Sequence, residues 1–364
     1  HLLASYNVGT LYFWDPSDTP LFQRAAIVSA APDDIRNMFV TPERFVIALC
    51  NNMVINWCTQ GDYTVWTPSA SNTAGTRTVT EGTKLVAGRT LGHATSLIWS
   101  DSAVYLHQYT GTSFVFDTRV VGKNCGLIAP SAVATVGAAA FWMGQNNFFQ
   151  FTSGGVVPMP MVEDIRKYVF DALDSENRYL CCAMYNATYN EIWFFYVNSG
   201  ELNPSLYAIF SLNTPSWAAG TLTRVGGTHF THGDTRPLWS DENGDILLHE
   251  EGFDDNGVAM DTQITMAPAG LDKGKRSMEI EGFEPDFFEQ EGQVTLTVNT
   301  YDRIRTAADT PMDTDVHTVE ETDGLLDVRV EGRYAGLTIR SNTLGGYFRL
   351  GAPVAYVKQS GARR

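Results

Sequence analysis

The sequence lacks the residue patterns on which most enzyme classes depend. It contains no GxSxG nucleophile elbow, no phosphate-binding P-loop and no HExxH metal motif. It also lacks clusters of Lys and Arg, and its 25 basic residues stand against 41 acidic ones, which gives a net charge of −16. Because tight binding to nucleic acid requires grouped cations that neutralise phosphates, the composition argues against a tight DNA binder. An acidic wall that DNA slides past is compatible with it.

Long apolar runs are missing as well. No stretch reaches the roughly 18 uninterrupted apolar residues that a membrane helix needs, and the N-terminus has no basic segment followed by an apolar one. We therefore predict a soluble chain with no integral membrane segment. The sequence starts at His1 rather than Met, which leaves room for upstream residues, and a strand that closes the predicted fold could lie among them.

Cysteine is scarce, and its spacing matches no metal site. There is no CxxC pair and no zinc-ligand spacing. An odd number of cysteines inside apolar segments or beside a glycine predicts buried free thiols in a reducing compartment. The five residues concerned are Cys50, Cys58, Cys125, Cys181 and Cys182.

What the chain does contain is a repeated hairpin pattern. Six times an apolar run enters a short Asn, Asp or Gly turn and leaves as a second apolar or aromatic run. Successive turn markers lie 40 to 57 residues apart and about 47 on average: Asn7, Asn51, Asp101, Asn146, Asn186 and Asn243. This period is typical of propeller blades, which bury their faces by stacking on one another. We predict an all-β fold with a β-propeller-like array of hairpin blades over residues 1–252.

Two further segments complete the predicted organisation. Residues 160–173 form the one predicted helix, with apolar residues at helical spacing: Val162, Ile165, Val169 and Leu173. Residues 253–364 predict a separate β-rich, sandwich-like domain or an antiparallel closing sheet, with strands within 277–287, 293–304, 325–342 and 347–359. Acidic residues are about twice as dense there as in the first 250 residues. The polar, acidic stretch 305–324 is predicted to be a long loop, which could become ordered only against a partner.

Two groups of residues suggest metal binding but have simpler explanations. The DENGD segment, with Asp241, Asn243 and Asp245, resembles the start of a calcium loop, yet Gly244 comes one place too early. We predict a hairpin turn there instead. His229, His232 and Asp234 could converge on a metal, but they lie between strands, and we interpret them as polar loop residues.

Two other groups suggest catalysis or ligand stacking. Glu163 and Asp164 could serve as glycosidase carboxylates, but acidic residues in a first helical turn are favoured by the helix dipole alone. Aromatic residues at strand ends could stack on sugars or bases, but their place in the repeats favours packing between blades: Trp14, Trp57, Tyr109, Phe151 and Tyr196. We predict no catalytic, cofactor or metal site and no enzymatic activity.

The order of several short segments resembles a family of bacteriophage proteins. The segments begin with VWTPSASNTAGTRTV (65–79), GTKLVAGRTLGHATSLIWSDSAVYLHQYTG (82–111), the run from VGKNCGLIAP to SGGVVPMP (121–160) and VEDIRKYVF (162–170). They continue with NEIWFFY, SLNTPSW, EGRYAGLTIRSN, YFRLG and the terminal SGARR. In this order they resemble the tail nozzle, or packaged-DNA stabilisation, proteins of short-tailed phages.

The resemblance implies a structural role in the virion tail. Such proteins form a homo-oligomeric ring, commonly a hexamer, below the portal and the head-to-tail adaptor and near tail fibres or spikes. The ring retains packaged DNA and forms the tail tube through which the genome is ejected. The protein would be made in the host cytoplasm.

The family offers no chemistry to transfer, so its matched residues are expected to be fold positions. The glycines would occupy turns that need positive φ, and the tryptophans would be buried in blades. These residues are Asn124, Cys125, Gly126, Trp142, Gly144, Gly154, Gly155 and Trp193.

The residues leave one rival class open. A carbohydrate-binding or carbohydrate-active propeller would carry its active groups on loops at one end of the central channel. It would need paired carboxylates or an Arg cluster, neither of which the sequence identifies. The nozzle hypothesis instead predicts acidic side chains that face a lumen and repel DNA.

Overall fold

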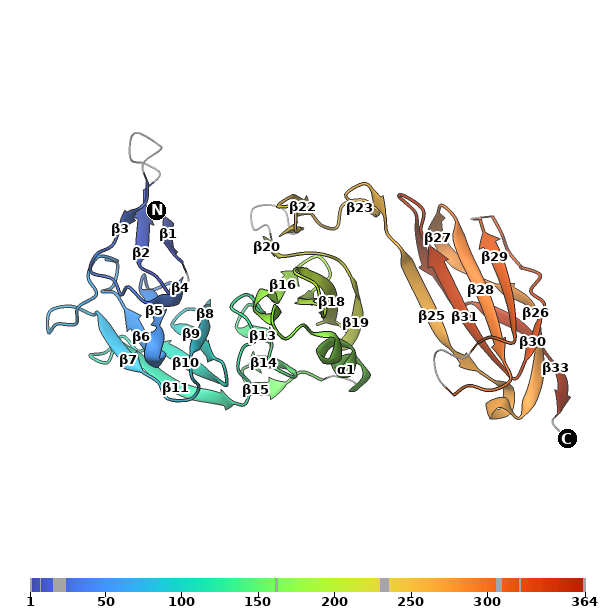
Figure 1. Ribbon diagram of the computed structural model, residues 1–364, viewed down its shortest axis with the longest axis horizontal. Helices are drawn as coiled ribbons and strands as arrows, with labels where there is room; N and C mark the ends of the chain where they lie inside the picture. Colours follow the sequence, from blue (N-terminus) through green and yellow to red (C-terminus); the bar gives the residue numbers. More distant parts are fainter. Residues whose placement is uncertain are drawn as a thin grey trace. The chain divides into compact units, whose positions relative to one another are not determined.

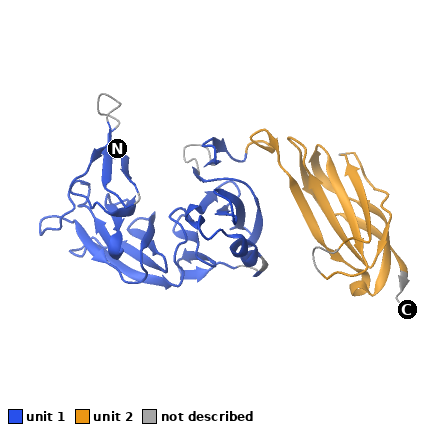
Figure 2. Cartoon of the chain, viewed as in Figure 1, with its two compact units in different colours: residues 1–250 blue, residues 251–364 orange. Residues whose placement is uncertain are grey.

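The chain is an all-β structure with one short α-helix in its described part (Figure 1). The computed structural model describes residues 2–6, 8–15, 24–160, 163–229, 236–305, 310–320 and 322–362. These residues form two compact units, His1–Glu250 and Glu251–Arg364 (Figure 2). The boundary between them lies two residues before the predicted one at 252. No helix in the described ranges is long and apolar enough to cross a membrane.

The described residues of unit 1 form a succession of six small antiparallel sheets, which we number as blades 1 to 6. In every blade the strands pair in sequence order. In their described parts, blades 1 and 6 have three strands each: β1 (Leu2–Ser5), β2 (Leu11–Trp14) and β3 (Ala26–Ile27), then β20 (Gly226–His229), β21 (Pro237–Ser240) and β22 (Ile246–Leu248).

The four central blades have four strands each. Blade 2 holds β4 (Ile35–Val40), β5 (Val46–Cys50), β6 (Val54–Trp57) and β7 (Gly75–Thr78). Blade 3 holds β8 (Leu85–Gly92), β9 (Thr95–Ser100), β10 (Ala103–Tyr109) and β11 (Phe116–Lys123). Blade 4 holds β12 (Val133–Val136), β13 (Ala139–Met143), β14 (Phe148–Thr152) and β15 (Gly155–Pro158). Blade 5 holds β16 (Cys182–Asn186), β17 (Glu191–Val197), β18 (Pro204–Ser211) and β19 (Ser216–Thr221).

Successive blades stack on one another. The first strand of each blade contacts the first strand of the next, from β1 to β4, β8, β12, β16 and β20. Four buried apolar clusters join blades 1 and 2, blades 2 and 3, blades 3 to 5, and blades 5 and 6. Each small sheet therefore buries its faces against its neighbours, which confirms the predicted propeller-like array.

All six predicted hairpins are present, as β1–β2, β5–β6, β9–β10, β13–β14, β16–β17 and β21–β22. Asn186 marks the turn between the first and second strands of its blade, whereas Asn146 and Asn243 mark turns between second and third strands. The marker in blade 5 thus comes one strand early. This explains why a gap of 40 residues is followed by one of 57. Asn7 lies outside the described residues.

The predicted helix is α1 (Glu163–Ala172), inserted between blades 4 and 5. Val169 is fully buried, and Ile165 and Leu173 pack against the cluster that joins blades 3 to 5. The apolar spacing therefore predicted the buried side of the helix correctly. Val162 lies outside the described residues. Two short 3-10 helices, η1 (Asn51–Met53) and η2 (Arg178–Leu180), complete unit 1.

The prediction that the matched glycines occupy positive-φ turns is right for only one of them. Gly155 has φ of 104°, and Asn124 also lies in the left-handed region, with φ of 56°. Gly126, Gly144 and Gly154 do not have positive φ. For these three, the expected reason was wrong.

Close approach explains two of those three glycines. A Cβ on Gly126 would lie 2.2 Å from the carbonyl oxygen of Asp101, so the backbone of the preceding blade leaves no room for a side chain. A Cβ on Gly144 would lie 2.7 Å from the ring of Phe149. The sequence marks both glycines but does not distinguish a tight contact from a special turn.

Unit 2 is a β-sandwich. One sheet has the order β25-β31-β28-β29 and the other the order β30-β26-β33, and β27 pairs with β32. The core contains side chains from both sheets, including Ile280 and Phe283 from one and Leu296, Val298 and Ile339 from the other. The strands are β23 (Asp254–Asp255), β24 (Val258–Ala259), β25 (Thr262–Ala269), β26 (Arg276–Glu284), β27 (Phe287–Glu291), β28 (Val294–Tyr301), β29 (Asp313–Val319), β30 (Val330–Gly332), β31 (Tyr334–Ser341), β32 (Tyr347–Leu350) and β33 (Val354–Ala362), with the 3-10 helix η3 (Leu271–Gly274) between β25 and β26.

The prediction of a continuous loop over 305–324 was wrong. Asp313–Val319 forms strand β29, which pairs with β28 along its length without any partner chain. β29 is an edge strand, and most of its side chains are exposed or half-buried, with Val319 buried at its end. Main-chain hydrogen bonds to one neighbour hold an edge strand of this kind. Its sequence can therefore be polar and shows little of the alternation of apolar and polar residues by which strands are recognised.

Candidate functional site

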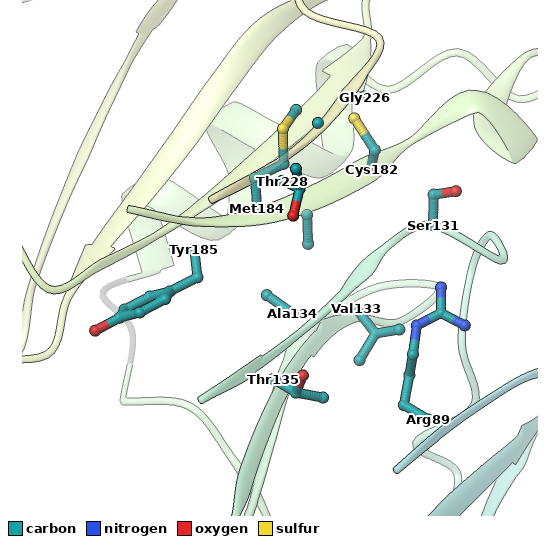
Figure 3. Close-up of a pocket in the computed structure, with 12 residues that line it drawn as sticks. Arg89, Ser131, Val133, Ala134, Thr135, Cys182, Met184, Tyr185, Gly226 and Thr228 are labelled. Carbon is teal, nitrogen blue, oxygen red and sulfur yellow. The ribbon is translucent and has the colours of Figure 1, made fainter. Parts of the chain in front are cut away.

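A pocket of about 330 Å³ lies where the first strands of blades 3 to 6 come together (Figure 3). In propellers, functional groups commonly lie near the central channel around which the blades are arranged. Its lining comes from β8, β12, β16, β20 and the residue at the bridge before β12: Arg89, Ser131, Val133, Ala134, Thr135, Cys182, Ala183, Met184, Tyr185, Gly226, Gly227 and Thr228.

Small residues on these strands leave the space open. Gly226 and Gly227 begin β20, and a Cβ on Gly227 would lie 2.5 Å from Cδ1 of Trp239. Trp239 is fully buried between blades 5 and 6, so glycine is required beside it. Ala134 and Ala183 add little bulk from β12 and β16. The pocket follows from these short side chains.

Among the described residues that line the pocket, Arg89 supplies the only charged side chain. Its Nη1 donates a hydrogen bond to the carbonyl oxygen of Gly88 and its Nη2 to that of Pro130, each at 2.9 Å. Burial lowers the pKa of Arg89 from its ordinary value. A guanidinium nevertheless keeps its proton in proteins, so the pocket contains a fixed positive charge.

Within the described residues, this charge has no ion-pair partner. The two carbonyl groups occupy two of the five N–H donors of the guanidinium, which leaves three. The hydroxyls of Ser131 and Thr135 line the same pocket, and in the described ranges neither makes a side-chain hydrogen bond. The site therefore offers donors and hydroxyls to a ligand. None of the described lining residues is a carboxylate, so these residues do not provide the acid and base pair of a glycosidase.

All five cysteines are buried free thiols, as predicted. Burial raises the pKa of Cys50 and Cys182 to about 12 and that of Cys125 and Cys181 to about 11. Thiols with such pKa values are protonated at neutral pH and are poor nucleophiles. Cys182, although it lines the pocket, donates to the carbonyl oxygen of Arg224 at 3.8 Å.

The calcium-like segment is the predicted hairpin turn, between β21 and β22. Asp241 Oδ1 accepts hydrogen bonds from the backbone N–H groups of Asn243 and Asp245, both at 2.9 Å. Gly244 has φ of 88°, a conformation that suits glycine. The carboxylate of Asp241 thus closes its own turn.

The other proposed ligand and catalytic groups do not come together in the described structure. His229 ends β20, but its side chain and the residues His232 and Asp234 lie outside the described part. Across the described ranges, no three His, Cys, Asp or Glu side chains are grouped as metal ligands. Glu163 pairs with Arg166 at 2.5 Å, and this hydrogen bond holds the pKa of Glu163 below its ordinary value. The side chain of Asp164 is outside the described structure.

The aromatic residues at strand ends are mostly packing residues. Trp57 and Tyr196 are buried in inter-blade clusters, and Tyr109 and Phe151 pack against such clusters while half-buried. Trp14 is half-buried outside them. Of the two matched tryptophans, Trp142 is fully buried and Trp193 is half-buried against Trp239. Packing between blades therefore accounts for most of these side chains.

Unit 2 contains an unusual pair of like charges. Glu279 on β26 lies directly opposite Glu331 on β30. The residues on either side of Glu279, Met278 and Ile280, are buried, so Glu279 belongs to the outer face of its sheet. Like charges placed directly opposite on one face destabilise a sheet. We call Glu279 and Glu331 the acidic pair.

Sequence reasoning missed both Arg89 and the acidic pair. The signal for Arg89 was a single charged residue inside the apolar run LVAGRTL, which by itself indicates no ligand. The acidic pair depends on the register between β26 and β30, strands about 50 residues apart in the chain. Neither could be found without the fold.

Comparison with known proteins gives structural likeness only. No protein-family model and no curated protein matches the sequence. The extracellular domain of BT4673 from B. thetaiotaomicron is similar with a TM-score of 0.37 and 8% identity, over 68% of this chain and 30% of that one. The WD40 β-propeller domain of Doa1 is similar with a TM-score of 0.33 and 10% identity, over 68% of this chain and 88% of that one. The chain thus spans under a third of the BT4673 domain. Because these TM-scores are low, the assignment of a propeller-like fold depends on the stacked blades described above.

Proposed function

We propose that this chain is a structural subunit of a bacteriophage tail nozzle. Identical copies form a closed ring, of six subunits by the family resemblance, below the portal and head-to-tail adaptor. The ring retains packaged DNA and forms the conduit for its ejection. The protein is not an enzyme in this proposal, and it belongs to the virion tail.

The acidic pair is the observation that carries this proposal beyond the resemblance. Glu279 and Glu331 oppose each other, and Lys358, which lies directly opposite Glu279 on β33, forms its ion pair with Glu281 at 3.3 Å. The lysine beside Glu279 and the hydroxyl of Ser360, which donates to Glu331 Oε1 at 2.7 Å, offset part of this repulsion, and we take the remaining negative charge of the face as its functional feature. Repulsion of DNA phosphates would be the use of this charge, because a conduit must let DNA pass without binding it.

Ring closure requires a head-to-tail contact between two different surfaces of one subunit. Among the described strands of unit 2 that pair on one side only, β33 and β25 are the longest, with β29 next. Apolar side chains are exposed on both, including Ile264 and Met266 on β25 and Tyr356 and Val357 on β33. Unpaired edges with exposed apolar residues are common sites for strand pairing between chains. We assign the ring contact to these edges.

The mass of the assembly tests the proposal. We expect mass photometry of the purified full chain to give a single species of six 40.1 kDa subunits, and addition of the chain to portal and adaptor to increase their mass by the same six subunits. Met266→Lys should shift the population toward single chains, because a charge would then be buried at the contact. Val120→Lys, on exposed strand β11, is the control and should leave the ring intact. A single-chain mass at every concentration and with every partner would overturn the proposal.

Reversing the acidic pair should make the protein adhere to DNA. We expect the double variant Glu279→Lys/Glu331→Lys to bind a DNA duplex that the wild type does not, because each lysine can neutralise a phosphate. The logarithm of the binding constant should fall with the logarithm of salt concentration with a slope of about −1.8 per subunit, from two contacts. Fluorescence anisotropy across a salt series measures this.

A control variant separates position from net charge. Asp117→Lys/Glu176→Lys makes the same charge change at exposed residues of unit 1. We expect this control variant to gain much less DNA affinity than the acidic-pair variant. We also expect particles that carry the acidic-pair variant to release their genome more slowly at low salt. Equal DNA binding by both variants would show that the acidic pair has no special role, and solubility would then explain the acidic composition.

A further inference from the structure

We propose that the pocket between the first strands of blades 3 to 6 binds a small hydroxylated monocarboxylate, of the class of a single uronic acid, with Arg89 as its anchor. The site lies within one chain and does not depend on ring assembly. Its test can therefore fail while the proposed tail function stands, and the reverse also holds.

The charge of the pocket favours a monoanion. Arg89 contributes one positive charge, and within the described residues no carboxylate lines the pocket and the guanidinium makes no ion pair. A half-buried cation without a partner is costly in a protein interior. One carboxylate would balance it, whereas a dianion would leave a surplus negative charge inside a chain of net charge −16.

The guanidinium is held ready for such a ligand. Its Nη1 and Nη2 donate hydrogen bonds of 2.9 Å to the carbonyl oxygens of Gly88 and Pro130. Gly88 belongs to β8 and Pro130 to the segment before β12, so the guanidinium is held between two segments of the backbone and its orientation is fixed. Figure 3 shows the head group of Arg89 on the same side of the pocket as Ser131. Three N–H donors are left, enough for the paired hydrogen bonds that arginine makes with carboxylates.

The remaining lining suits the hydroxylated body of the ligand. The hydroxyls of Ser131 and Thr135 can each donate or accept a hydrogen bond. Val133, Ala134 and Met184 provide an apolar wall for the C–H face of a sugar ring. A volume of about 330 Å³ is at the small end of the roughly 300–1,000 Å³ range of ligand pockets, which fits one monosaccharide rather than a chain.

Ligand-observed NMR on the full chain tests this with a matched set of probes. We expect saturation transfer and a saturable, millimolar Kd for glucuronate, with at least tenfold weaker binding of glucose, which lacks the carboxylate, and of acetate, which lacks the hydroxyls. Arg89→Met should weaken glucuronate binding by about ten- to a hundredfold, the range expected when a charged hydrogen-bond partner is lost. Arg119→Met, at an exposed position of β11 in the same blade, should bind like the wild type.

A second variant keeps the test decisive if Arg89→Met folds poorly. Ser131 is exposed at the pocket wall, so Ser131→Leu should fold normally and obstruct the pocket. We expect it to abolish glucuronate binding while the far-ultraviolet circular dichroism stays unchanged. Equal binding of glucose and glucuronate, or wild-type binding by Ser131→Leu, would overturn the proposal.

Discussion

Replacing Trp142 with alanine should lower the free energy of unfolding of unit 1 by about 3–5 kcal/mol, the cost typical of a large aromatic side chain removed from a core. Trp142 on β13 is fully buried. Its ring meets Trp99 of blade 3 edge-on, with centroids 5.5 Å apart, and its Nε1 donates to the carbonyl oxygen of Cys125 at 2.8 Å. The change would therefore remove packing between two blades and leave a buried carbonyl unsatisfied.

Urea unfolding followed by tryptophan fluorescence measures this effect in unit 1 alone, because all eight tryptophans precede residue 250. Trp14→Ala is the matched control. Trp14 is half-buried and lies outside the inter-blade clusters, so we expect a loss of about 1 kcal/mol. Equal losses for the two variants would mean that blade stacking at Trp142 contributes no more to stability than a partly exposed side chain.

The hairpins were predictable because their information is local. A turn such as the one at Asp241 is specified by a side chain that bonds to the backbone two and four residues on. The apolar residues of α1 and of β28 likewise follow the periods of a helix and a strand. Each pattern depends on neighbours in sequence, so one chain suffices to recognise it.

The remaining features depend on contacts between distant segments. Gly126 is a glycine because the backbone at Asp101 approaches it, and β29 is a strand because β28 offers it a free edge. Arg89 becomes a candidate anchor only when the carbonyl of Pro130 lies beside it. Residues of these kinds carry the candidate sites, which explains why the fold was easier to predict than the pocket.

Lowering the pH below 6.5 should destabilise unit 1 through His107. This side chain on β10 is 1% exposed, stacks on Phe116 with ring centroids 4.2 Å apart, and shares a 2.8 Å hydrogen bond between Nδ1 and the hydroxyl of Thr118. Burial lowers the pKa of His107 to about 3, and within the described residues its Nε2 has no hydrogen-bond partner. The folded protein therefore holds this histidine neutral at mildly acidic pH.

The direction of the effect follows from the two pKa values. In the unfolded chain His107 has the ordinary pKa of about 6.5, so between pH 6.5 and 3 the unfolded state binds a proton that the folded state does not. The stability that the neutral histidine provides is complete above pH 6.5 and is lost as pH falls through this window. The expected loss is about 1.4 kcal/mol per pH unit, or about 2 kcal/mol between pH 6.5 and 5.0.

Urea unfolding at pH 7.0, 6.0 and 5.0, followed by tryptophan fluorescence, measures this slope, and the variant His107→Gln isolates it. Glutamine does not titrate and can still hydrogen-bond to Thr118, so the variant should be less stable than the wild type at pH 7 but should lose about 2 kcal/mol less between pH 6.5 and 5.0. That pH range lies above the ordinary pKa values of Asp and Glu, which keeps most carboxylate titration out of the comparison. The ring of His107 lies at the contact between blades 2 and 3, with its centroid 6.0 Å from that of Trp57. A wild-type slope that persists unchanged in His107→Gln would mean that other groups cause the acid sensitivity. It would also mean that His107 gains its proton without opening this contact.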